Sequence, residues 1–226
     1  MKYQMVYFDL DNTLLDFSRS EKEALKLTLL EYGILINESQ IELYIEINKK
    51  WWQAFSKGLY SKDYIVRARF KDFLEKIKAK RVEYSEAAEK YLKNLSNLAY
   101  FMPGAEEFLT KMKLSGQKMA VLTNGVRAVQ EKRAKILKLD RFIEFILSSE
   151  QVGKPKPDPA LFVEASRLSG ISLSECVYIG DDPEVDFKAA KNAGTEFILL
   201  DYAGVYPDFE HNRVENFDEL YLKLSM

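Results

Sequence analysis

The sequence predicts an α/β fold, a parallel sheet with an inserted helical unit, and two observations support this prediction. All six prolines lie after residue 102, and only two glycines, Gly33 and Gly58, precede that point. Because both residue types are unfavourable inside helices, the part before Pro103 should be mostly helical. From Pro103 onward, short β-rich runs alternate with segments of helical length. This alternation is typical of a parallel sheet whose strands are joined by helices.

The first expected element is a strand at Tyr3–Phe8, and four stretches with apolar residues at helical spacing follow it. A possible capping box, Ser18-x-x-Glu21, precedes the first stretch. We expect a four-helix unit of about 80 residues that interrupts the sheet after its first strand. We assign residues 17–99 to this inserted cap, and residues 1–16 and 100–226 to the α/β core. The four stretches cover Ala24–Leu30, Ile41–Phe55, Val66–Ile77 and Ala88–Leu98.

The second part of the chain should supply the remaining strands of the same sheet and the helices that cover it. Helices are expected to begin near Gly104, Arg127, Asp158 and Pro183. The expected strands are Met119–Leu122, Phe145–Leu147, Cys176–Ile179 and Phe197–Leu200.

Polar clusters follow several of these strands directly. The first strand leads into Asp9–Thr13, the second into Thr123–Gly125, and the strand at Cys176 into Gly180–Asp182. A rigid lysine-bearing loop, Gly153–Pro159, follows the third strand. Because the carboxyl ends of parallel strands lie along one edge of a sheet, where such folds bind ligands, we expect these clusters to converge.

The converging residue types suit the chemistry of a phosphoryl group. Carboxylates gathered this closely repel one another, and we expect a hard divalent cation that prefers oxygen ligands, Mg²⁺, to relieve that repulsion. A metal, a lysine, a hydroxyl and main-chain N–H groups would together neutralise phosphoryl oxygens. The sequence contains neither a P-loop nor a GxGxxG motif, so a phosphomonoester is favoured over a bound nucleoside triphosphate or dinucleotide.

Four ordered motifs carry a family resemblance. Asp9-x-Asp11-x-Thr13, Thr123-Asn124, Lys156-Pro157 and Gly180-Asp181-Asp182-x-x-x-Asp186 resemble the motifs of the haloacid dehalogenase (HAD) superfamily. The resemblance implies a Rossmann-like, HAD-like core, and the insert looks like the helical cap of subfamily I. Within that subfamily, Asp9–Phe17 and Ile47–Phe55 look most like the noncanonical pyrimidine 5′-nucleotidases.

The resemblance implies a role for each motif residue. Asp9 would be the nucleophile that forms an aspartyl-phosphate, and Asp11 the general acid and base. Thr123 and the Asn124 N–H would hold phosphoryl oxygens. Lys156 would neutralise the phosphate and bind the nucleophile. Lys154-Pro155 is a competing Lys-Pro pair, but Lys156 occupies the position before Pro157-Asp158-Pro159 that matches the family's segment.

The same resemblance implies the ligands of the metal. The Asp9 carboxylate, the Asp11 carbonyl and the Asp181 carboxylate would bind Mg²⁺, with Asp182 and Asp186 as additional or outer groups. An Asp-Asp-Pro sequence before a helix is also good N-capping chemistry, so Asp182 and Asp186 have a structural alternative.

Aromatic residues of the cap are candidates for binding a base. Phe17 lies at the hinge between core and cap, and Trp51 and Trp52 are adjacent on an expected helix. Neighbouring helical residues face about 100° apart, so one tryptophan should belong to the cap core while the other faces the substrate. We assign Phe17 and Trp51 to substrate binding.

The predicted function is a Mg²⁺-dependent phosphomonoester hydrolase, a 5′-nucleotidase for pyrimidine nucleoside monophosphates. One alternative is a phosphatase for another small metabolite, such as phosphoglycolate or a sugar phosphate, and a phosphosugar mutase would keep the same motifs. A haloacid dehalogenase has no need for Asp11 or the Asp181-Asp182 pair, and an aspartyl-phosphate signalling module would be about half this length without a cap.

Composition limits the partners. Lys and Arg number 33 against 35 Asp and Glu, a formal charge of −2, so no bulk basic surface favours a nucleic-acid polymer or anionic lipid. The single cysteine, Cys176, excludes an internal disulfide and suits a reducing compartment. The apolar segment before Asp9 is too short for a signal peptide, and no run is long enough to span a bilayer. We expect a cytoplasmic enzyme with a small-molecule substrate and no obligate protein partner.

Overall fold

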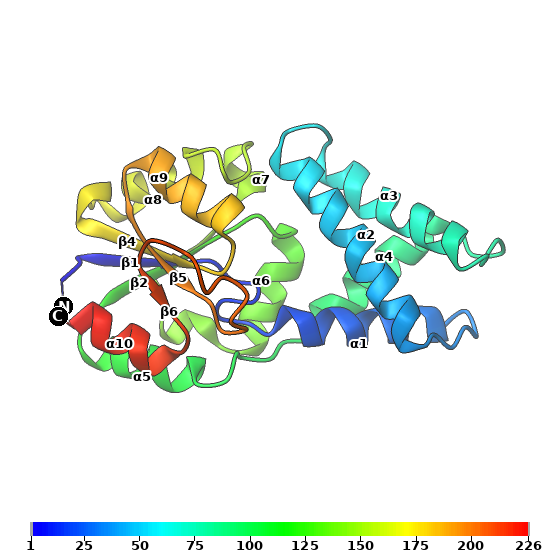
Figure 1. The fold of residues 1–226 in the computed structure, drawn as a ribbon, viewed down its shortest axis with the longest axis horizontal. Helices are drawn as coiled ribbons and strands as arrows, with labels where there is room; N and C mark the ends of the chain where they lie inside the picture. The colour runs from blue at the N-terminus through cyan, green and yellow to red at the C-terminus, as the bar shows by residue number, and fades with distance from the viewer. Residues whose placement is uncertain (1, 226) are drawn as a thin grey trace.

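The structure, a computed structural model, describes residues 2–225. Within this range the chain forms a six-stranded sheet in the order β3-β2-β1-β4-β5-β6, and every neighbouring pair is parallel. The expected α/β fold with an inserted helical cap is confirmed (Figure 1). The strands are β1 (Met5–Phe8), β2 (Lys118–Thr123), β3 (Ile146–Ser148), β4 (Cys176–Gly180), β5 (Glu196–Leu200) and β6 (Arg213–Val214).

The five expected strands are present, with ends that differ from the predicted ones by at most two residues. The register places Phe8 of β1 opposite Val121 of β2 and Ile179 of β4. The residues that follow these positions therefore leave the sheet at the same edge. Strand β6 was not predicted, because its two residues are too few to show an apolar pattern.

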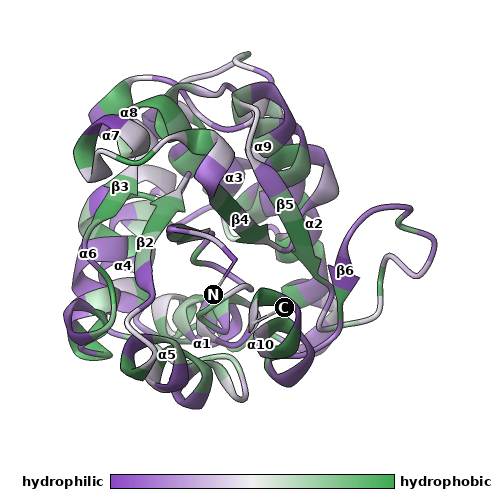
Figure 2. Cartoon of the chain, turned by 90° about the vertical axis from the view of Figure 1, so that its left-hand side faces the viewer, coloured by the Kyte–Doolittle hydropathy of each residue, from purple (hydrophilic) through white to green (hydrophobic). Residues whose placement is uncertain are grey.

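Both faces of the sheet are covered, which explains why its strands are almost continuously apolar. On β1, Val6 and Phe8 belong to a core cluster with helices α5 and α10, whereas Met5 and Tyr7 belong to a second cluster with α8 and α9. Figure 2 shows the central strands in green between helices whose outer surfaces carry much of the purple.

Helices of the core connect the strands and end the chain. Their bounds are α5 (Ala105–Leu114), α6 (Arg127–Ile136), α7 (Ser149–Val152), α8 (Ala160–Ser169), α9 (Lys188–Ala193) and α10 (Phe217–Ser225). The connections also contain two 3₁₀ turns, Leu139–Arg141 and Leu173–Glu175, and a short π-helix, Pro183–Phe187, directly after β4. Among residues 2–225 no helix is long and apolar enough to cross a membrane.

The helical unit lies between β1 and β2 in the chain and to one side of the sheet in space (Figure 1). Its helices pack on one another around their own apolar cluster, which contains Leu25, Tyr44, Phe70 and Tyr91. The chain leaves and re-enters the core at one place, where Leu15 pairs with Phe101. The helices are α1 (Phe17–Leu30), α2 (Glu38–Ser56), α3 (Lys62–Lys76) and α4 (Tyr84–Ser96).

The start of α1 corrects one expectation. Its N-cap is Asp16, whose carboxylate accepts a hydrogen bond from the Arg19 N–H, so Ser18 does not form the expected capping box. Ser18 instead donates to Asn12. Glu21 is buried in the cap.

Candidate active site

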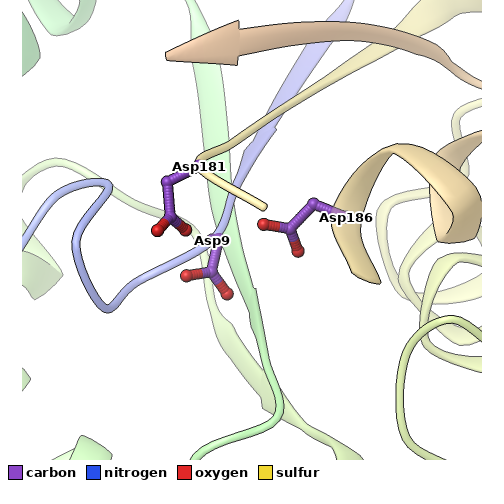
Figure 3. Close-up of side chains that lie close together, drawn as sticks. All are labelled: Asp9, Asp181 and Asp186. Carbon is purple, nitrogen blue, oxygen red and sulfur yellow. The ribbon is translucent and has the colours of Figure 1, made fainter. Parts of the chain in front are cut away.

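Three carboxylates meet at the carboxyl edge of the sheet. Asp9 follows β1, Asp181 follows β4, and Asp186 lies in the π-helix after β4. One oxygen from each of these residues lies within 4.8 Å of the others, and Figure 3 shows the three side chains directed toward one another. The predicted convergence of the β1 and β4 clusters is therefore present in the structure.

Lys156 places its ammonium group among these carboxylates. Its Nζ lies 2.6 Å from Asp9 Oδ1, 2.7 Å from Asp186 Oδ1 and 2.6 Å from the Tyr178 hydroxyl. The Leu122 carbonyl is a further acceptor, at 3.2 Å. The side chain is only 2% exposed, so both ion pairs are shielded from water and have low dielectric surroundings.

Burial and charge act together on the ionisation of this group. Burial raises the pKa of Asp9 to about 7. The positive charge of Lys156 acts against this shift, and the negative charge of Asp186 adds to it. Burial and the neighbouring charges of Asp186 and Asp9 raise the pKa of Asp181 well above its usual value. Burial lowers the pKa of Lys156, but the charges of Asp186 and Asp9 outweigh it and hold that pKa above its ordinary value. The lysine is therefore a permanent cation, while the carboxylates need a further cation to ionise together.

The competing lysine lies elsewhere. Lys154 is exposed, and its ammonium group forms an ion pair with Asp158 at 3.4 Å. Position in the structure thus favours Lys156 over Lys154 as the lysine that meets a phosphoryl group.

Thr123 and Asn124 lie at the end of β2 beside this cluster. The Thr123 hydroxyl oxygen accepts a hydrogen bond from the Gly125 N–H at 3.0 Å. The Asn124 side chain bonds both the N–H and the carbonyl of Lys156, at 2.9 and 3.0 Å. Asn124 therefore fixes the lysine loop with its side chain, which leaves its main chain as the part able to meet a phosphoryl oxygen.

Asp11 is held by two residues that the sequence analysis did not identify. Arg133 Nη1 donates to Asp11 Oδ1 at 2.5 Å, and Gln130 Nε2 donates to Asp11 Oδ2 at 2.6 Å. Arg133 is fully buried and also donates to the Leu98 carbonyl. A Cβ at Gly125 would overlap the Gln130 side chain, which explains the glycine after Thr123-Asn124.

The aspartates of the segment after β4 make different contacts. Asp186 accepts hydrogen bonds from the Tyr178 hydroxyl at 3.0 Å and the Asp182 N–H at 3.2 Å. A Cβ at Gly180 would overlap Asp186, so the glycine permits this close approach. Asp182 uses Oδ1 to accept from the N–H groups of Glu184 and Val185, as an N-cap does. Asp182 also lines the cavity at this edge, but it is not one of the three carboxylates, Asp9, Asp181 and Asp186, whose oxygens lie within 4.8 Å of one another.

The donor set fits a hard divalent cation. It consists of carboxylate oxygens alone, the ligands that Mg²⁺ prefers. Lys156 uses one oxygen each of Asp9 and Asp186, which leaves the second Asp9 oxygen and the Asp181 carboxylate for a cation. Thr13 approaches Asp181 Oδ1 at 3.5 Å and helps to orient it. Arg133 and Gln130 each donate to one oxygen of the Asp11 carboxylate, which fixes the direction of that side chain.

A cavity of about 250 Å³ lies between this edge of the sheet and the cap. Asp9, Thr123, Lys156 and Asp181 line it on the core side. The cap side combines apolar and aromatic residues with polar ones: Phe17, Trp52, Leu92 and Leu95 line it together with Lys49, Gln53, Ser56 and the buried Arg69.

The structure places the two cap tryptophans, of which Trp51 was assigned to substrate binding, in different surroundings. Trp52 lines the cavity, as Phe17 does, whereas Trp51 lies against a separate surface depression with Asp72. The Trp51 indole donates to Asp72 at 2.9 Å, and its ring contacts Tyr60 and Tyr64 edge-on. The two adjacent tryptophans thus face different directions, and it is Trp52, not Trp51, that lines the cavity between cap and core.

The architecture and the edge cluster point to one family. The family model described as "Haloacid dehalogenase-like hydrolase" matches residues 6–200. The chain belongs to this family. A crystal structure of the HAD-hydrolase YfnB from Bacillus subtilis, bound to magnesium, superposes with a TM-score of 0.90 at 26% identity and covers 100% of both chains.

Two curated relatives indicate the type of reaction. The pyrimidine 5′-nucleotidase PynA of Streptococcus pneumoniae is 30% identical over 200 residues, which cover 88% of this chain and 84% of PynA. A glyceraldehyde 3-phosphate phosphatase of Methanopyrus kandleri is 29% identical over 209 residues, covering 91% of this chain and 86% of that enzyme. Both relatives act on phosphomonoesters, in agreement with the predicted enzyme class, and this chain is a hydrolase of that kind.

Proposed function

We propose that this enzyme hydrolyses nucleoside 5′-monophosphates, pyrimidine ones in preference to purine ones, through an aspartyl-phosphate on Asp9. The observation that carries the proposal is a single cavity with two different walls. Its core wall holds Asp9 beside the Lys156 ammonium group, and its cap wall presents Phe17 and Trp52. The first wall suits a phosphate and the second suits a flat ring.

The chemistry requires a carboxylate nucleophile and a bound phosphate. An Asp9 oxygen attacks phosphorus, the bond from phosphorus to the nucleoside 5′-oxygen breaks, and that oxygen departs with the electron pair. Lys156 binds Asp9 already and would also offset the negative charge of the phosphoryl oxygens. The Thr123 hydroxyl and the Asn124 N–H would donate to those oxygens. Water then attacks phosphorus, which releases phosphate and restores the carboxylate.

Asp11 is proposed as the general acid that protonates the departing 5′-oxygen and as the base that then deprotonates the water. It follows Asp9 by two residues and lines the same cavity. Its bonds to Arg133 and Gln130 orient the carboxyl group.

We propose Mg²⁺ as the metal, held by the carboxylates of Asp9 and Asp181 and the main-chain carbonyl of Asp11, with Asp186 behind them. When bound, Mg²⁺ would neutralise charge on the carboxylates and the phosphoryl group. The magnesium in the YfnB structure supports this choice.

We also propose that residues 17–99 form the cap domain and residues 1–16 with 100–226 the core domain, although Met1 and Met226 lie outside the described residues. Separate apolar clusters in the helical unit and in the sheet support this division. So does the hydrogen bond from the Asp16 N–H to the Tyr100 carbonyl, which marks the place where the two connections meet.

A substrate screen tests the function. Phosphate release should be measured with Mg²⁺ on the 5′-monophosphates of uridine, thymidine, cytidine and adenosine, and on phosphoglycolate, glyceraldehyde 3-phosphate and glucose 6-phosphate. We expect the pyrimidine nucleotides to have the highest kcat/KM. If a small acid or sugar phosphate has the highest value, the nucleotidase assignment fails while the phosphatase assignment stands.

The aromatic wall supplies a second test. Phe17→Ala and Trp52→Ala should each lower kcat/KM for uridine 5′-monophosphate by roughly tenfold or more, because stacking on a base contributes ~1–3 kcal/mol. Activity on ribose 5-phosphate, which has no base, should change little. Trp51→Ala is the matched control, since Trp51 lies outside the cavity. A larger loss from Trp51→Ala than from Trp52→Ala would contradict this view of the base site.

A further inference from the structure

The cap contains a row of buried, hydrogen-bonded polar side chains to which no role has been assigned above. Glu21 of α1, Asn48 of α2 and Arg69 of α3 are 4%, 5% and 2% exposed. Asn48 Nδ2 donates to Glu21 Oε1 at 2.5 Å, and Arg69 Nη1 donates to Asn48 Oδ1 at 2.6 Å. Burying charged and amide groups inside a helical bundle is costly unless hydrogen bonds satisfy them.

Arg69 is the member of this hydrogen-bonded row that lines the cavity. The residue lines the cavity together with Trp52, Leu92 and Leu95. Its Nε is buried and has no hydrogen-bond partner among the described residues. A guanidinium has five N–H donors, and Asn48 is its one hydrogen-bond acceptor in the described part of the chain. Arg69 is thus a buried cation with spare donors at the wall of the proposed substrate site.

The charge of Arg69 is only partly offset inside the cap. Neutral Asn48 lies between Arg69 and Glu21 and bonds to both. Burial raises the pKa of Glu21 to about 7, although the positive charge of Arg69 acts against this shift. The Tyr91 ring lies 4.9 Å from the guanidinium carbon and offers it a π face. Near neutral pH, therefore, a substantial fraction of Glu21 is protonated, and an oxygen acceptor from a ligand would complete the surroundings of Arg69.

We propose that Arg69 is a specificity-determining residue that donates hydrogen bonds to a ring carbonyl oxygen of the pyrimidine base. The inference rests on the proposed nucleotidase function. Lys156 on the core side accounts for the phosphate, so the second buried cation of the cavity is available for the other end of the substrate. Trp52 and the two leucines beside Arg69 suit the faces of a flat ring better than a hydrated anion.

The proposal ranks bases by their oxygen atoms. Uracil and thymine carry two ring carbonyl groups, cytosine carries one, and adenine carries none. A buried donor left without its acceptor penalises a ligand that lacks the oxygen, so rejection of such a ligand should be strong.

A cycle of two enzymes and two substrates tests the proposal. The enzymes are the wild type and Arg69→Met. The substrates are uridine 5′-monophosphate and the 5′-monophosphate of a phenyl C-riboside, whose ring has a similar shape and no oxygen. We expect Arg69→Met to lower kcat/KM for the uridine nucleotide on the order of 10- to 100-fold, with a change of less than about threefold for the phenyl compound. Arg67→Met is the control, because Arg67 lies on the same helix, is 39% exposed and pairs with Asp63 and Glu89 on the surface.

The remaining outcomes are decisive as well. Equal losses on both substrates, or no loss on either, would overturn the role of Arg69. Phosphoglycolate is measured as a third substrate, and a loss of kcat/KM on it alone would show that the acceptor is a carboxylate and would overturn the base assignment. If Arg69→Met does not fold, the same two substrates are measured with Arg69→Lys. The wild type alone also tests the proposal, because a ratio near one between its kcat/KM values for the uridine nucleotide and the phenyl compound would refute it. A wild type that does not hydrolyse uridine 5′-monophosphate at all would instead refute the proposed function.

Discussion

The ammonium group of Lys156 is the cation around which the carboxylates of Asp9 and Asp186 are arranged. Each of these charges is expensive to bury alone, and each is tolerable beside the others. The Tyr178 hydroxyl and the Leu122 carbonyl occupy further donor positions of the lysine, so its orientation is fixed before a substrate arrives. Such preorganisation means that little reorganisation is needed when charge develops on a phosphoryl group.

Replacement of this lysine should therefore have a large effect on catalysis. We predict that Lys156→Ala lowers kcat by about a hundredfold or more, because the cation beside Asp9 is lost. Lys154→Ala should leave kcat within about twofold, since Lys154 is exposed and bonded only to Asp158 among described residues. Steady-state kinetics on the best substrate of the screen make the comparison. The opposite ranking would place the phosphate two residues earlier in the chain.

Glu21 gives a prediction about pH and stability. Burial raises its pKa from 4.5 to about 7 in the folded protein, so the folded state binds a proton that the unfolded state has already lost. The stability that this proton provides is complete below about pH 4.5 and is lost as the pH rises through 7, a change of roughly 3 kcal/mol.

Urea unfolding of the wild type and of Glu21→Gln at pH 5 and pH 8 measures this effect. The glutamine variant should gain stability relative to the wild type by roughly 2.5 kcal/mol between the two pH values. Glu42→Gln is the control, because Glu42 is exposed on the same cap. A difference between Glu21→Gln and the wild type that does not change with pH would contradict the burial of an ionisable carboxyl at this position.

At the scale of elements, the sequence was informative where a pattern is local. The strands β1, β2, β4 and β5 follow from near-continuous apolar runs, and the cap helices follow from their spacing. Contacts between distant elements left no such pattern. Arg133 and Gln130 lie on α6 and bond Asp11, about 120 residues away in the chain. A single sequence does not show which polar residues of a helix turn toward a distant strand.

Helix phase explains why Trp52 rather than Trp51 lines the cavity. The 100° between neighbouring residues predicted that only one of them could face the substrate, but the direction of the cavity depends on how α2 packs on α3. The short elements were missed for a different reason. The two residues of β6 are too few to show an alternating pattern. Helix α10 (Phe217–Ser225) does carry apolar residues at helical spacing, but its nine residues were not among the expected helices.

At the scale of the whole molecule, the cap touches the catalytic edge directly. Lys62, near the start of α3, donates to the Gly125 carbonyl at 2.8 Å and to Ser149 Oγ at 3.0 Å, and pairs with Glu150 at 3.1 Å. Gly125 belongs to the turn that follows Thr123-Asn124. The position of the cap is thereby linked to the loop proposed to bind phosphate.

The metal proposal applies to the molecule as a whole, because cation binding joins residues from β1, β4 and the π-helix. We predict that EDTA abolishes phosphate release and that added Mg²⁺ restores it, since carboxylates whose oxygens lie within 4.8 Å of one another repel, and a divalent cation relieves that repulsion. Mg²⁺ should also raise the midpoint of thermal unfolding by mass action. Full activity after exhaustive chelation, with no change in thermal stability, would rule out the metal site.

The positions of Trp51 and Trp52 have an optical consequence. They are the only tryptophans of the chain, and both belong to α2. Excitation of tryptophan therefore reports on the cap alone, without background emission from the sheet. In a Trp51→Phe variant, the remaining indole would be the one at the cavity wall, so its fluorescence would give a direct titration signal for any ligand that enters.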